Sequence, residues 1–289
     1  MTDKFQLSDE EVGTVIDLAL AEDISHGDIT SEVLIPPDLT GKAVIIARET
    51  GILAGGEIAQ RVFRRIDPSL KVDILIKDGH RIKPEDIIAE ISGRVISILK
   101  AERVGLNFLQ RLSGIASLTA QYAAAAAGSA AIVTDTRKTT PGLRLLEKYA
   151  VRMGGGHNHR FHLGDGILIK DNHLSALRTK GISLKETVTR ARENAPEGIK
   201  VEVEVTTTEE AVEAMAAGAD IIMLDNMSPD EMRRVTGLVA GRAKIEASGG
   251  ITLANIRQVA MTGVDIISVG ALTHSSKALD ISIELESAD

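Results

Sequence analysis

Four short apolar segments decide the fold: VEVEV (201–205), IIMLD (221–225), KIEAS (244–248) and IISVG (266–270). They recur about every 20 residues, and segments with a helical pattern, such as TTEEAVEAMAAG (207–218), separate them. Two more strands of the same kind come earlier in the chain, IVTDT (132–136) and ILIKD (167–171). Six strand–helix units in series predict a parallel sheet that is either closed as a barrel or open and doubly wound.

The segment VEVEV favours the barrel. Successive side chains of a strand point to opposite faces, so Glu202 and Glu204 share one face and the three valines share the other. An open doubly wound sheet needs two apolar faces, whereas a barrel strand can carry polar residues inside and apolar residues outside, under the helices. We therefore expect a barrel with both carboxylates in its interior.

The residues before this region predict a separate α/β domain. Residues 8–21 have the pattern of an amphipathic helix, with Ser8 as N-cap and Glu11 in position for a capping box. The pattern then predicts strands at 42–48 and 71–76, a helix near 57–66, and a long helix over 100–127. We expect an N-terminal domain at 1–112, a barrel at 113–274, and a tail, 275–289, that returns to the first domain.

Composition excludes several classes of function. The net charge is −8, from 33 lysines and arginines against 41 acids, and aromatic residues make up 2%, so nucleic acid is not an expected partner. The sequence has no apolar run of transmembrane length and no apolar stretch of a signal peptide at its start, so no membrane partner is expected. It has no cysteine, which excludes a thiol nucleophile and fits a cytoplasmic location.

A basic cluster spans residues 135–173, which hold seven lysines and arginines, four of the seven histidines and only four acids. Thr136-Arg137-Lys138 follow one predicted strand, and Lys170 lies near the end of the next. These are the strand ends where barrels carry their active sites. Between them runs GGGHNHRFHLGDG (154–166), a loop whose glycines let backbone approach an anion.

Two bland alternatives exist for this cluster: a solvated basic face, or histidines that coordinate a metal. The two strand ends and the glycine loop favour a binding function, because arginine clamps carboxylate or phosphate and lysine adds a point charge. The spacing of His157, His159 and His162 does not match a zinc site.

Two carboxylates form a second candidate group. Glu204 and Asp225 each lie at the end of a strand and should point to the barrel mouth, where they could bind Mg²⁺, hold sugar hydroxyls or stabilise a developing cation. Ion pairing with neighbouring lysines is the plainer alternative. We prefer that alternative for Glu202, one layer deeper, and a functional role for Glu204 and Asp225.

Glycine turns follow the last two strands, and these turns predict a phosphate site. They are Ser248-Gly249-Gly250 and Val269-Gly270-Ala271. In barrels, loops after the late strands and a helix N-terminus commonly bind phosphate. Glycine also simply ends strands, so each turn alone is a weak signal, and two in consecutive units are a stronger one.

One long segment of this chain closely resembles the signature of the quinolinate phosphoribosyltransferases, which are the carboxylating nicotinate-nucleotide pyrophosphorylases. The segment is TDTRKTTPGLRLLEKYAVRMGGGHNHRFHLGDGILIKDNH (134–173). Further segments resemble the family in the expected order: LAEDISHGDITS (20–31), ERVGLNFLQRLSGIAS (102–117), VEVEV, MLDNMSP, EASGGI and DIISVGALTHS. The resemblance covers nearly the whole chain. One departure is Ser117, where the family is expected to have threonine.

The resemblance implies an N-terminal α/β sandwich and an incomplete parallel α/β barrel of six or seven strands. It implies a homodimer whose active site is shared between subunits, or a hexamer. The implied reactants are quinolinate and phosphoribosyl pyrophosphate, with Mg²⁺. The implied products are nicotinate mononucleotide, pyrophosphate and CO2, a step of NAD synthesis.

The family's residues can be carried over by motif. The substrate site would contain Thr136, Arg137, Lys138, His159, Arg160 and Lys170. Of these, Arg137, His159, Arg160 and Lys170 would bind the two carboxylates of quinolinate, with Lys138 near the reacting groups. Arg103, otherwise an ordinary helical residue, would enter from the partner subunit. Glu204 and Asp225 would meet the ribose and Mg²⁺. The 5-phosphate would be held by Ser248, Gly249, Gly250, Val269, Gly270 and Ala271, with His274 nearby.

Three other functions stay open from sequence. A paralogue with the same barrel, such as the relatives associated with molybdenum transport, would act on a different substrate. A nicotinate-specific phosphoribosyltransferase would need fewer cations than the cluster provides. A phosphosugar-binding protein without activity would have no use for Glu204 and Asp225.

Overall fold

The structure, a computed structural model, describes residues 7–286. The residues before Leu7, where no signal peptide is expected, and residues 287–289 of the predicted tail lie outside the described part. The chain divides into two compact units. The first comprises Met1–Ala120, Thr139–Gly155 and Leu272–Asp289, and the second comprises Gln121–Lys138 and Gly156–Ala271.

The first unit is built on a four-stranded antiparallel sheet with the order β12-β1-β5-β3. Its strands are β1 (Thr40–Ala47), β3 (Lys71–Ile74), β5 (Ile87–Arg94) and β12 (Ile281–Leu285), and β2 (Gly51–Ile52) pairs separately with β4 (Arg81–Ile82). Ile45 of β1 pairs with Ile283 of β12, so the last described strand of the chain is an edge of this sheet.

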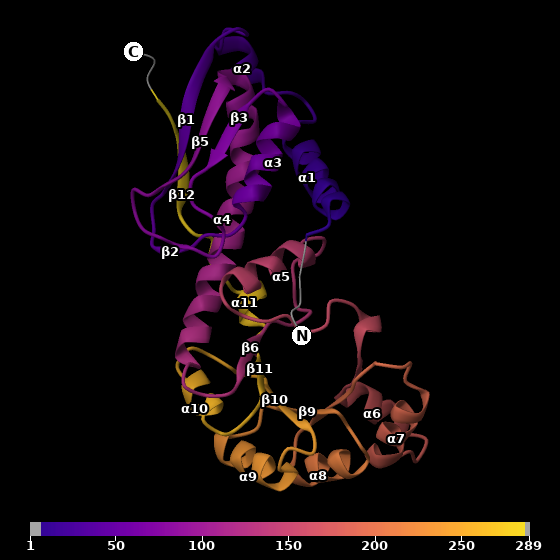
Figure 1. The fold of residues 1–289 in the computed structure, drawn as a ribbon. Coiled ribbons are helices and arrows are strands. Elements are labelled where there is room, and N and C mark those ends of the chain that lie inside the picture. Colours follow the sequence, from indigo (N-terminus) through magenta and orange to yellow (C-terminus); the bar gives the residue numbers. More distant parts are fainter. Residues whose placement is uncertain (1–6, 287–289) are drawn as a thin grey trace. The chain divides into compact units, whose positions relative to one another are not determined.

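The helices of this unit are α1 (Asp9–Ile24), α2 (Ile29–Leu34), α3 (Gly56–Ile66), α5 (Arg144–Met153) and the part of α4 (Val95–Ala125) that runs to Ala120. In Figure 1, α3 lies beside β3, and α1 lies beside α3. The Ser8 hydroxyl accepts a hydrogen bond from the backbone N–H of Glu11 at 3.3 Å, as predicted for the N-cap of α1. The buried residues of α3 include Ile58, Val62 and Phe63, which recur at helical spacing.

The segment 139–155 belongs to the first unit. The boundary predicted from sequence, between residues 112 and 113, instead assigns this segment to the barrel. Its helix α5 carries Glu147, which is fully buried and accepts a 2.8 Å hydrogen bond from Arg111 of α4. Tyr149 of the same helix donates a 2.7 Å bond to Asp78. These bonds join the segment to residues that precede position 113 in the chain.

The second unit contains a parallel sheet of six strands with the order β6-β11-β10-β9-β8-β7. The strands are β6 (Ile132–Thr134), β7 (Ile167–Ile169), β8 (Val201–Val205), β9 (Ile221–Asp225), β10 (Lys244–Ser248) and β11 (Ile266–Ser268). All six predicted strands are present. On the edge strand β6, His157 forms an isolated parallel bridge with Thr134, so part of the glycine loop extends the sheet.

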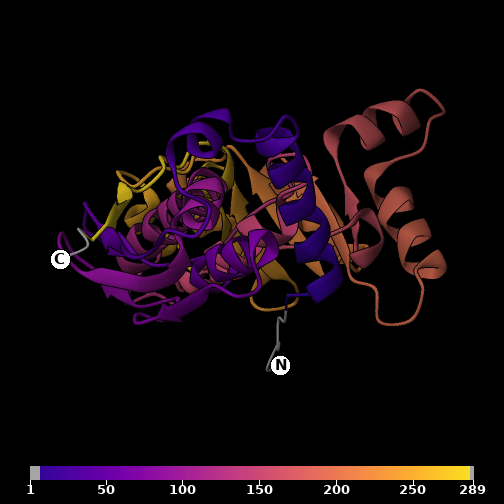
Figure 2. The same cartoon turned by 90° about the horizontal axis from the view of Figure 1, so that it is seen from above.

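The helices of the second unit are α6 (Asp171–Arg178), α7 (Leu184–Asn194), α8 (Thr208–Ala216), α9 (Pro229–Val239) and the short α10 (Ile256–Ala260). The helix α11 (Ala271–His274) begins at Ala271, the last residue of the second unit, and continues into the first unit. Figure 1 shows α8 and α9 outside the strands β8 to β10, and Figure 2 shows α6 beside α7. The three valines of β8 are buried. No helix of residues 7–286 has the length and apolar character to cross a membrane.

The turn after β10 brings backbone close to the end of β9. Gly249 and Gly250 have φ angles of +84° and +62°, in the left-handed region. A Cβ atom on Gly249 would lie 2.5 Å from Oδ1 of Asn226, whose backbone N–H donates to the Ser248 carbonyl at 2.9 Å. A side chain at position 249 would therefore be strained by the backbone conformation and would displace the Asn226 side chain.

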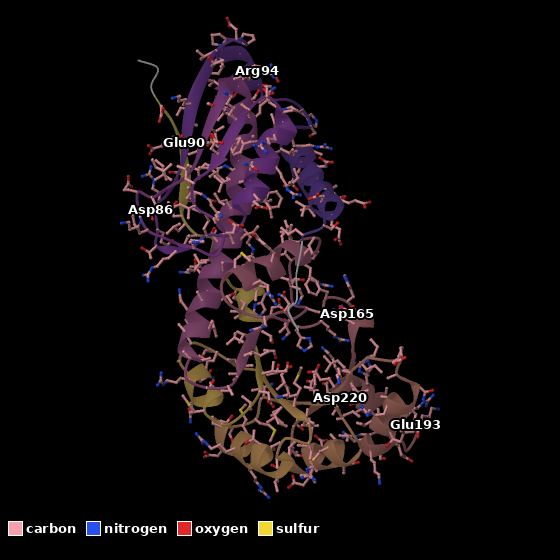
Figure 3. The ribbon with its side chains drawn as sticks, viewed as in Figure 1. Asp86, Glu90, Arg94, Asp165, Glu193 and Asp220 are labelled. Atoms are coloured by element: carbon pink, nitrogen blue, oxygen red, sulfur yellow. The ribbon has the colours of Figure 1, made fainter. Side chains whose placement is uncertain are left out.

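Asp67, at the end of α3, gathers bonds from three neighbouring elements in the first unit. It is 4% exposed and accepts hydrogen bonds from the Ser69 hydroxyl at 2.6 Å and the Ser97 hydroxyl at 2.8 Å. Arg94, which Figure 3 labels, donates a 2.8 Å bond to the same carboxylate. The bonds from Ser69, Ser97 and Arg94 outweigh the effect of burial and hold the pKa of Asp67 well below its ordinary 3.8.

We expect Asp67→Asn to lower the free energy of unfolding by about 2–3 kcal/mol at pH 7, because it removes the charge from several buried hydrogen bonds. The folded pKa is depressed, so this stabilisation is fully present above pH 3.8 and is lost as the pH falls below that value. Urea unfolding at pH 7 and pH 3 measures both effects. Asp17→Asn, which breaks an exposed pair with Arg65, is the control and should change stability far less. A pH-independent difference would contradict the interpretation.

We expect Gly249→Ala to lower the stability of the protein by about 1–3 kcal/mol more than Gly241→Ala. Gly241 has a similar φ of +78°, but a Cβ atom there would meet no heavy atom within 4 Å. The comparison of the two melting curves therefore isolates the contact with Asn226. Equal losses in the two variants would mean that Asn226 moves aside without cost.

Candidate active site

A pocket of about 300 Å³ opens within the second unit, at the carboxyl ends of the strands. Nine residues predicted from sequence line it: Thr136, Arg137, Lys138, His159, Arg160, Lys170, Glu204, Asp225 and Ser248. The strand topology brings seven of them together, because parallel strands place their carboxyl ends at one edge of the sheet, and the loop before β7 adds His159 and Arg160. The predicted basic cluster and the predicted acidic pair thus share one pocket.

Asp135 fixes the loop that carries the central basic residues. This carboxylate is fully buried, accepts a 2.6 Å bond from the Asn158 amide, and accepts a 2.9 Å bond from the backbone N–H of His159. Farther along, Asp165, labelled in Figure 3, accepts bonds from the backbone N–H groups of Phe161 and His162. Asp135 is not among the residues predicted from sequence. The sign of its role in the sequence is its position, as an acid between a predicted strand and a run of cations.

His159 lies between the carboxylates of Glu202 and Glu246. These two residues come two positions before Glu204 in β8 and Ser248 in β10. Its Nε2 atom is 3.3 Å from Oε2 of Glu202 and 3.5 Å from Oε2 of Glu246. Glu202 is 5% exposed and Glu246 is fully buried. The ion pair predicted for Glu202 is therefore present, but its partner is His159 and not a lysine. Glu246 was not singled out from sequence.

Burial and charge act against one another in this layer. Burial raises the pKa of Glu202, the bond from His159 lowers it, and the charge of Glu246 raises it again, with a net increase. Burial lowers the pKa of His159, but the bond to Glu202 and the nearby negative charge of Glu246 outweigh burial and raise the pKa to about 10. The backbone nitrogen of Arg160 lies 2.9 Å from Nδ1 of His159.

The layer around Glu202 and Glu246 is polar but sparsely bonded. A second cavity of about 230 Å³ reaches it, and its lining includes Thr134, Glu202 and Glu246. Among the described residues, the Thr134 hydroxyl, Oε1 of Glu202 and both carboxylate oxygens of Glu246 have no hydrogen-bond partner. Within the same residues, His159, Glu202 and Glu246 form the one group of three whose ligand atoms are close enough to hold a metal ion. His157 and His162 are not part of it.

The mouth of the pocket has a basic side and an acidic side. On the basic side, burial and the charge of Arg137 lower the pKa of Arg160, a shift that an anion would reverse. On the acidic side, burial and the charges of Asp225 and Asp171 raise the pKa of Glu204, and they outweigh the charge of Lys170, which lowers it. The arrangement can therefore hold a ligand that is anionic at one end and brings a cation at the other.

The remaining predicted residues do not line this pocket. Gly249 and Gly250 form the turn after Ser248, while Val269, Gly270 and Ala271 follow β11. Val269 is buried, and its backbone N–H donates to the Thr134 carbonyl at 2.9 Å. Arg103 and His274 belong to the first unit, where both are exposed. Their predicted roles toward the site stay predictions.

The chain matches two family descriptions in succession. Residues 28–113 match the N-terminal domain of quinolinate phosphoribosyl transferase, and residues 115–284 match its C-terminal domain. A probable nicotinate-nucleotide pyrophosphorylase (carboxylating) of Bacillus subtilis is 46% identical over 264 residues, which cover 91% of this chain and 90% of that protein. The chloroplastic nicotinate-nucleotide pyrophosphorylase (carboxylating) of Arabidopsis thaliana is 44% identical over 292 residues, which cover 96% and 83%.

Solved structures give the same result for the fold. NadC from Streptococcus pyogenes superposes with a TM-score of 0.93 at 44% identity, over 98% of this chain and 99% of that one. The nicotinate-nucleotide pyrophosphorylase from Francisella tularensis superposes with a TM-score of 0.91 at 40% identity, over 99% and 100%. Since both domains are matched in order and the relatives cover nearly the whole chain, the protein belongs to the quinolinate phosphoribosyl transferase family.

Proposed function

We propose that the protein transfers the phosphoribosyl group of phosphoribosyl pyrophosphate to quinolinate and releases nicotinate mononucleotide, pyrophosphate and CO2. The observation that carries the proposal is the pocket with one basic and one acidic side, lined by Arg137, Lys138, Arg160 and Lys170 and by Glu204 and Asp225. Relatives named as carboxylating pyrophosphorylases support the same reaction.

The basic side suits a dicarboxylate. Arg137, Arg160 and Lys170 line the pocket together, and two guanidinium groups can each hold a carboxylate through paired hydrogen bonds. Nicotinate carries one carboxylate fewer than quinolinate and would leave part of this charge uncompensated. This excess favours quinolinate over the nicotinate-specific alternative.

The acidic side suits Mg²⁺ that arrives with pyrophosphate. Burial raises the pKa of Glu204, and the charges of Asp225 and Asp171 raise it further; a divalent cation relieves such repulsion. Glu204 and Asp225 would hold the ion, directly or through water, and it would neutralise charge on the leaving pyrophosphate. Ser248 and the turn at Gly249 and Gly250 would bind the 5-phosphate through hydroxyl and backbone N–H groups.

The proposed chemistry has two steps. The ring nitrogen of quinolinate forms a bond to C1 of the ribosyl group as the bond to pyrophosphate breaks, and Glu204 and Asp225 stabilise the positive charge that develops on the sugar. The ring nitrogen is then quaternary, so the ring accepts the electron pair left when the 2-carboxylate departs as CO2, and a proton takes its place. Holding two polyanions side by side supplies much of the rate.

We also propose that the site is completed by a second copy of the chain. By motif, Arg103 of a partner subunit would reach the dicarboxylate, in a homodimer or in a hexamer made of dimers. Arg103 is exposed and lies 4.0 Å from Glu102, an arrangement that leaves its guanidinium accessible to a ligand. A cytoplasmic location, without nucleic-acid or membrane partners, stays a prediction from composition.

Purified protein mixed with quinolinate, phosphoribosyl pyrophosphate and Mg²⁺ should release CO2 and nicotinate mononucleotide in equal amounts. Excess EDTA should stop the reaction, because the acidic side then lacks its cation. Nicotinate in place of quinolinate is the matched control. Product from nicotinate alone would support the nicotinate-specific enzyme, and binding of phosphoribosyl pyrophosphate without any product would support a phosphosugar-binding protein.

Two variants should fail for different reasons. Lys138→Ala should lose most of kcat, about a hundredfold, because under the proposed role its ammonium group would lie near the reacting groups. Arg103→Ala should mainly raise the KM for quinolinate, because it removes one anion-binding group. Steady-state kinetics separate the two effects, and turnover of the Lys138 variant at the wild-type rate would exclude its role.

Mixing these two variants tests the shared site. In a homodimer, random exchange gives half heterodimers, each with one intact site, so activity at low quinolinate should recover to about a quarter of the wild-type value. Each variant mixed with itself is the control. If activity does not recover after subunit exchange has been verified, Arg103 acts within its own subunit or not at all.

A further inference from the structure

Asn226, the residue directly after Asp225, has a backbone conformation that residues other than glycine rarely adopt. Its φ angle is +53°, in the left-handed region. Asparagine enters this region more easily than most residues with a side chain, because its short amide can bond to nearby groups. Such a conformation next to a candidate active site indicates a local requirement for this residue.

The amide of Asn226 contacts the acidic side of the pocket. Its Nδ2 atom donates a 3.1 Å hydrogen bond to Oδ2 of Asp225. The carboxylate accepts and the NH2 group donates, so this bond also fixes which way the amide is turned. Asp225 lines the pocket and Asn226 does not, so the amide supports the acid from outside the lining.

The same amide lies against the glycine turn after β10. A Cβ atom on Gly249 would be 2.5 Å from Oδ1, 2.6 Å from Cγ and 2.7 Å from Nδ2 of Asn226. These nearly equal distances place the flat amide over the face of Gly249 that has no side chain. The backbone N–H of Asn226 also donates to the Ser248 carbonyl at 2.9 Å. One residue therefore contacts both the acid at the end of β9 and the turn at the end of β10.

The bond to Asp225 is exposed, and an exposed hydrogen bond between neighbours is weak by itself because water competes for it. Here the amide is already held by the backbone bond to Ser248 and by its packing on Gly249, so little freedom is lost when it bonds to the acid. Asp225 needs such support, because it shares the pocket with Glu204, a group of like charge.

We propose that Asn226 is a positioning residue that joins the two halves of the phosphoribosyl pyrophosphate site. Its amide orients the Asp225 carboxylate toward Mg²⁺ and pyrophosphate, and it holds the turn at Gly249 that binds the 5-phosphate. This inference rests on the proposed function and refines it, since it adds a residue that touches neither substrate. It also gives a reason for glycine at position 249, where a side chain would displace the amide.

A second asparagine holds the same turn and provides a matched control. Nδ2 of Asn255 donates to the Gly250 carbonyl at 2.9 Å, and its Oδ1 accepts the backbone N–H of Thr252 at 2.8 Å. Neither bond involves Asp225. Loss of the Asn255 side chain should therefore loosen the turn and leave the orientation of the acid unchanged.

Binding of three ligands, measured by titration calorimetry without turnover, tests the proposal. Ribose 5-phosphate probes the turn, pyrophosphate with Mg²⁺ probes the acidic side, and quinolinate probes the basic side. We expect Asn226→Gly to weaken the binding of ribose 5-phosphate and of Mg²⁺ pyrophosphate about fivefold each, and to leave quinolinate binding unchanged. Asn255→Ala should weaken the binding of ribose 5-phosphate only.

Two substitutions at position 226 separate the amide from the backbone. Glycine adopts a φ of +53° without strain, so Asn226→Gly should fold. Asn226→Ala removes the same amide and strains the backbone, so it should bind the three ligands as Asn226→Gly does and melt at a lower temperature. If Asn226→Gly binds like the wild type and only Asn226→Ala is impaired, the conformation matters and the amide does not, and the proposal fails.

Three further outcomes would overturn the proposal. Unchanged binding of Mg²⁺ pyrophosphate in Asn226→Gly would mean that Asp225 does not depend on the amide. An equal loss of that binding in Asn255→Ala would mean that any loosening of the turn disturbs the acidic side. A loss of quinolinate binding in Asn226→Gly would mean a general distortion of the barrel. If the wild type binds neither ribose 5-phosphate nor Mg²⁺ pyrophosphate, the proposed function itself fails, and this inference fails with it.

Discussion

Charge inside the barrel of the second unit must be balanced within the barrel, because closely packed strands and helices leave little water to solvate it. This constraint divides the interior into two layers. In the deeper layer the charge of His159 lies close to the carboxylates of Glu202 and Glu246, at 3.3 Å and 3.5 Å. At the mouth the balance is incomplete, since burial and like charge lower the pKa of Arg160 and raise that of Glu204. The deeper layer is structure, and the incompletely balanced mouth is where ligands would supply the missing charges.

Most of the second unit could be predicted from sequence because its pattern is local. The alternation of VEVEV and the spacing of the late strands depend on residues that are neighbours in the chain, and β8, β9 and β10 have the predicted bounds. The membership of 139–155 could not be predicted in this way. It follows from the bond between Arg111 and Glu147, two residues 36 positions apart, and an acid in a helix gives no sign of which distant arginine it will meet.

The same distinction applies to the site. Residues at or just after strand ends could be assigned to the pocket, because strand ends converge whatever the details of packing, and seven of them line it. His159 and Arg160 line it from the glycine loop before β7. Asp135 and Glu246 could not be assigned, because they contact the basic loop through side chains and their strand positions alone suggest ordinary buried acids. The ring orientation of His159 lies beyond sequence too, since it depends on which nitrogen faces the Arg160 amide and which faces the carboxylates.

The strand order adds a reason for the two substrates to be adjacent. β6 pairs with β11, and the backbone N–H of Val269 bonds to Thr134, so the segment that leads into Arg137 and Lys138 runs beside the turn at Gly270. At the other edge β7 pairs with β8, which brings the end of the strand before Lys170 beside the strand of Glu204. Under the proposed roles, the cations that follow the edge strands β6 and β7 thus lie beside residues that would bind the phosphoribosyl group, at Gly270 and Glu204. The order of the strands, and not the charge of any one residue, then places the nucleophile of one substrate against the ribose of the other.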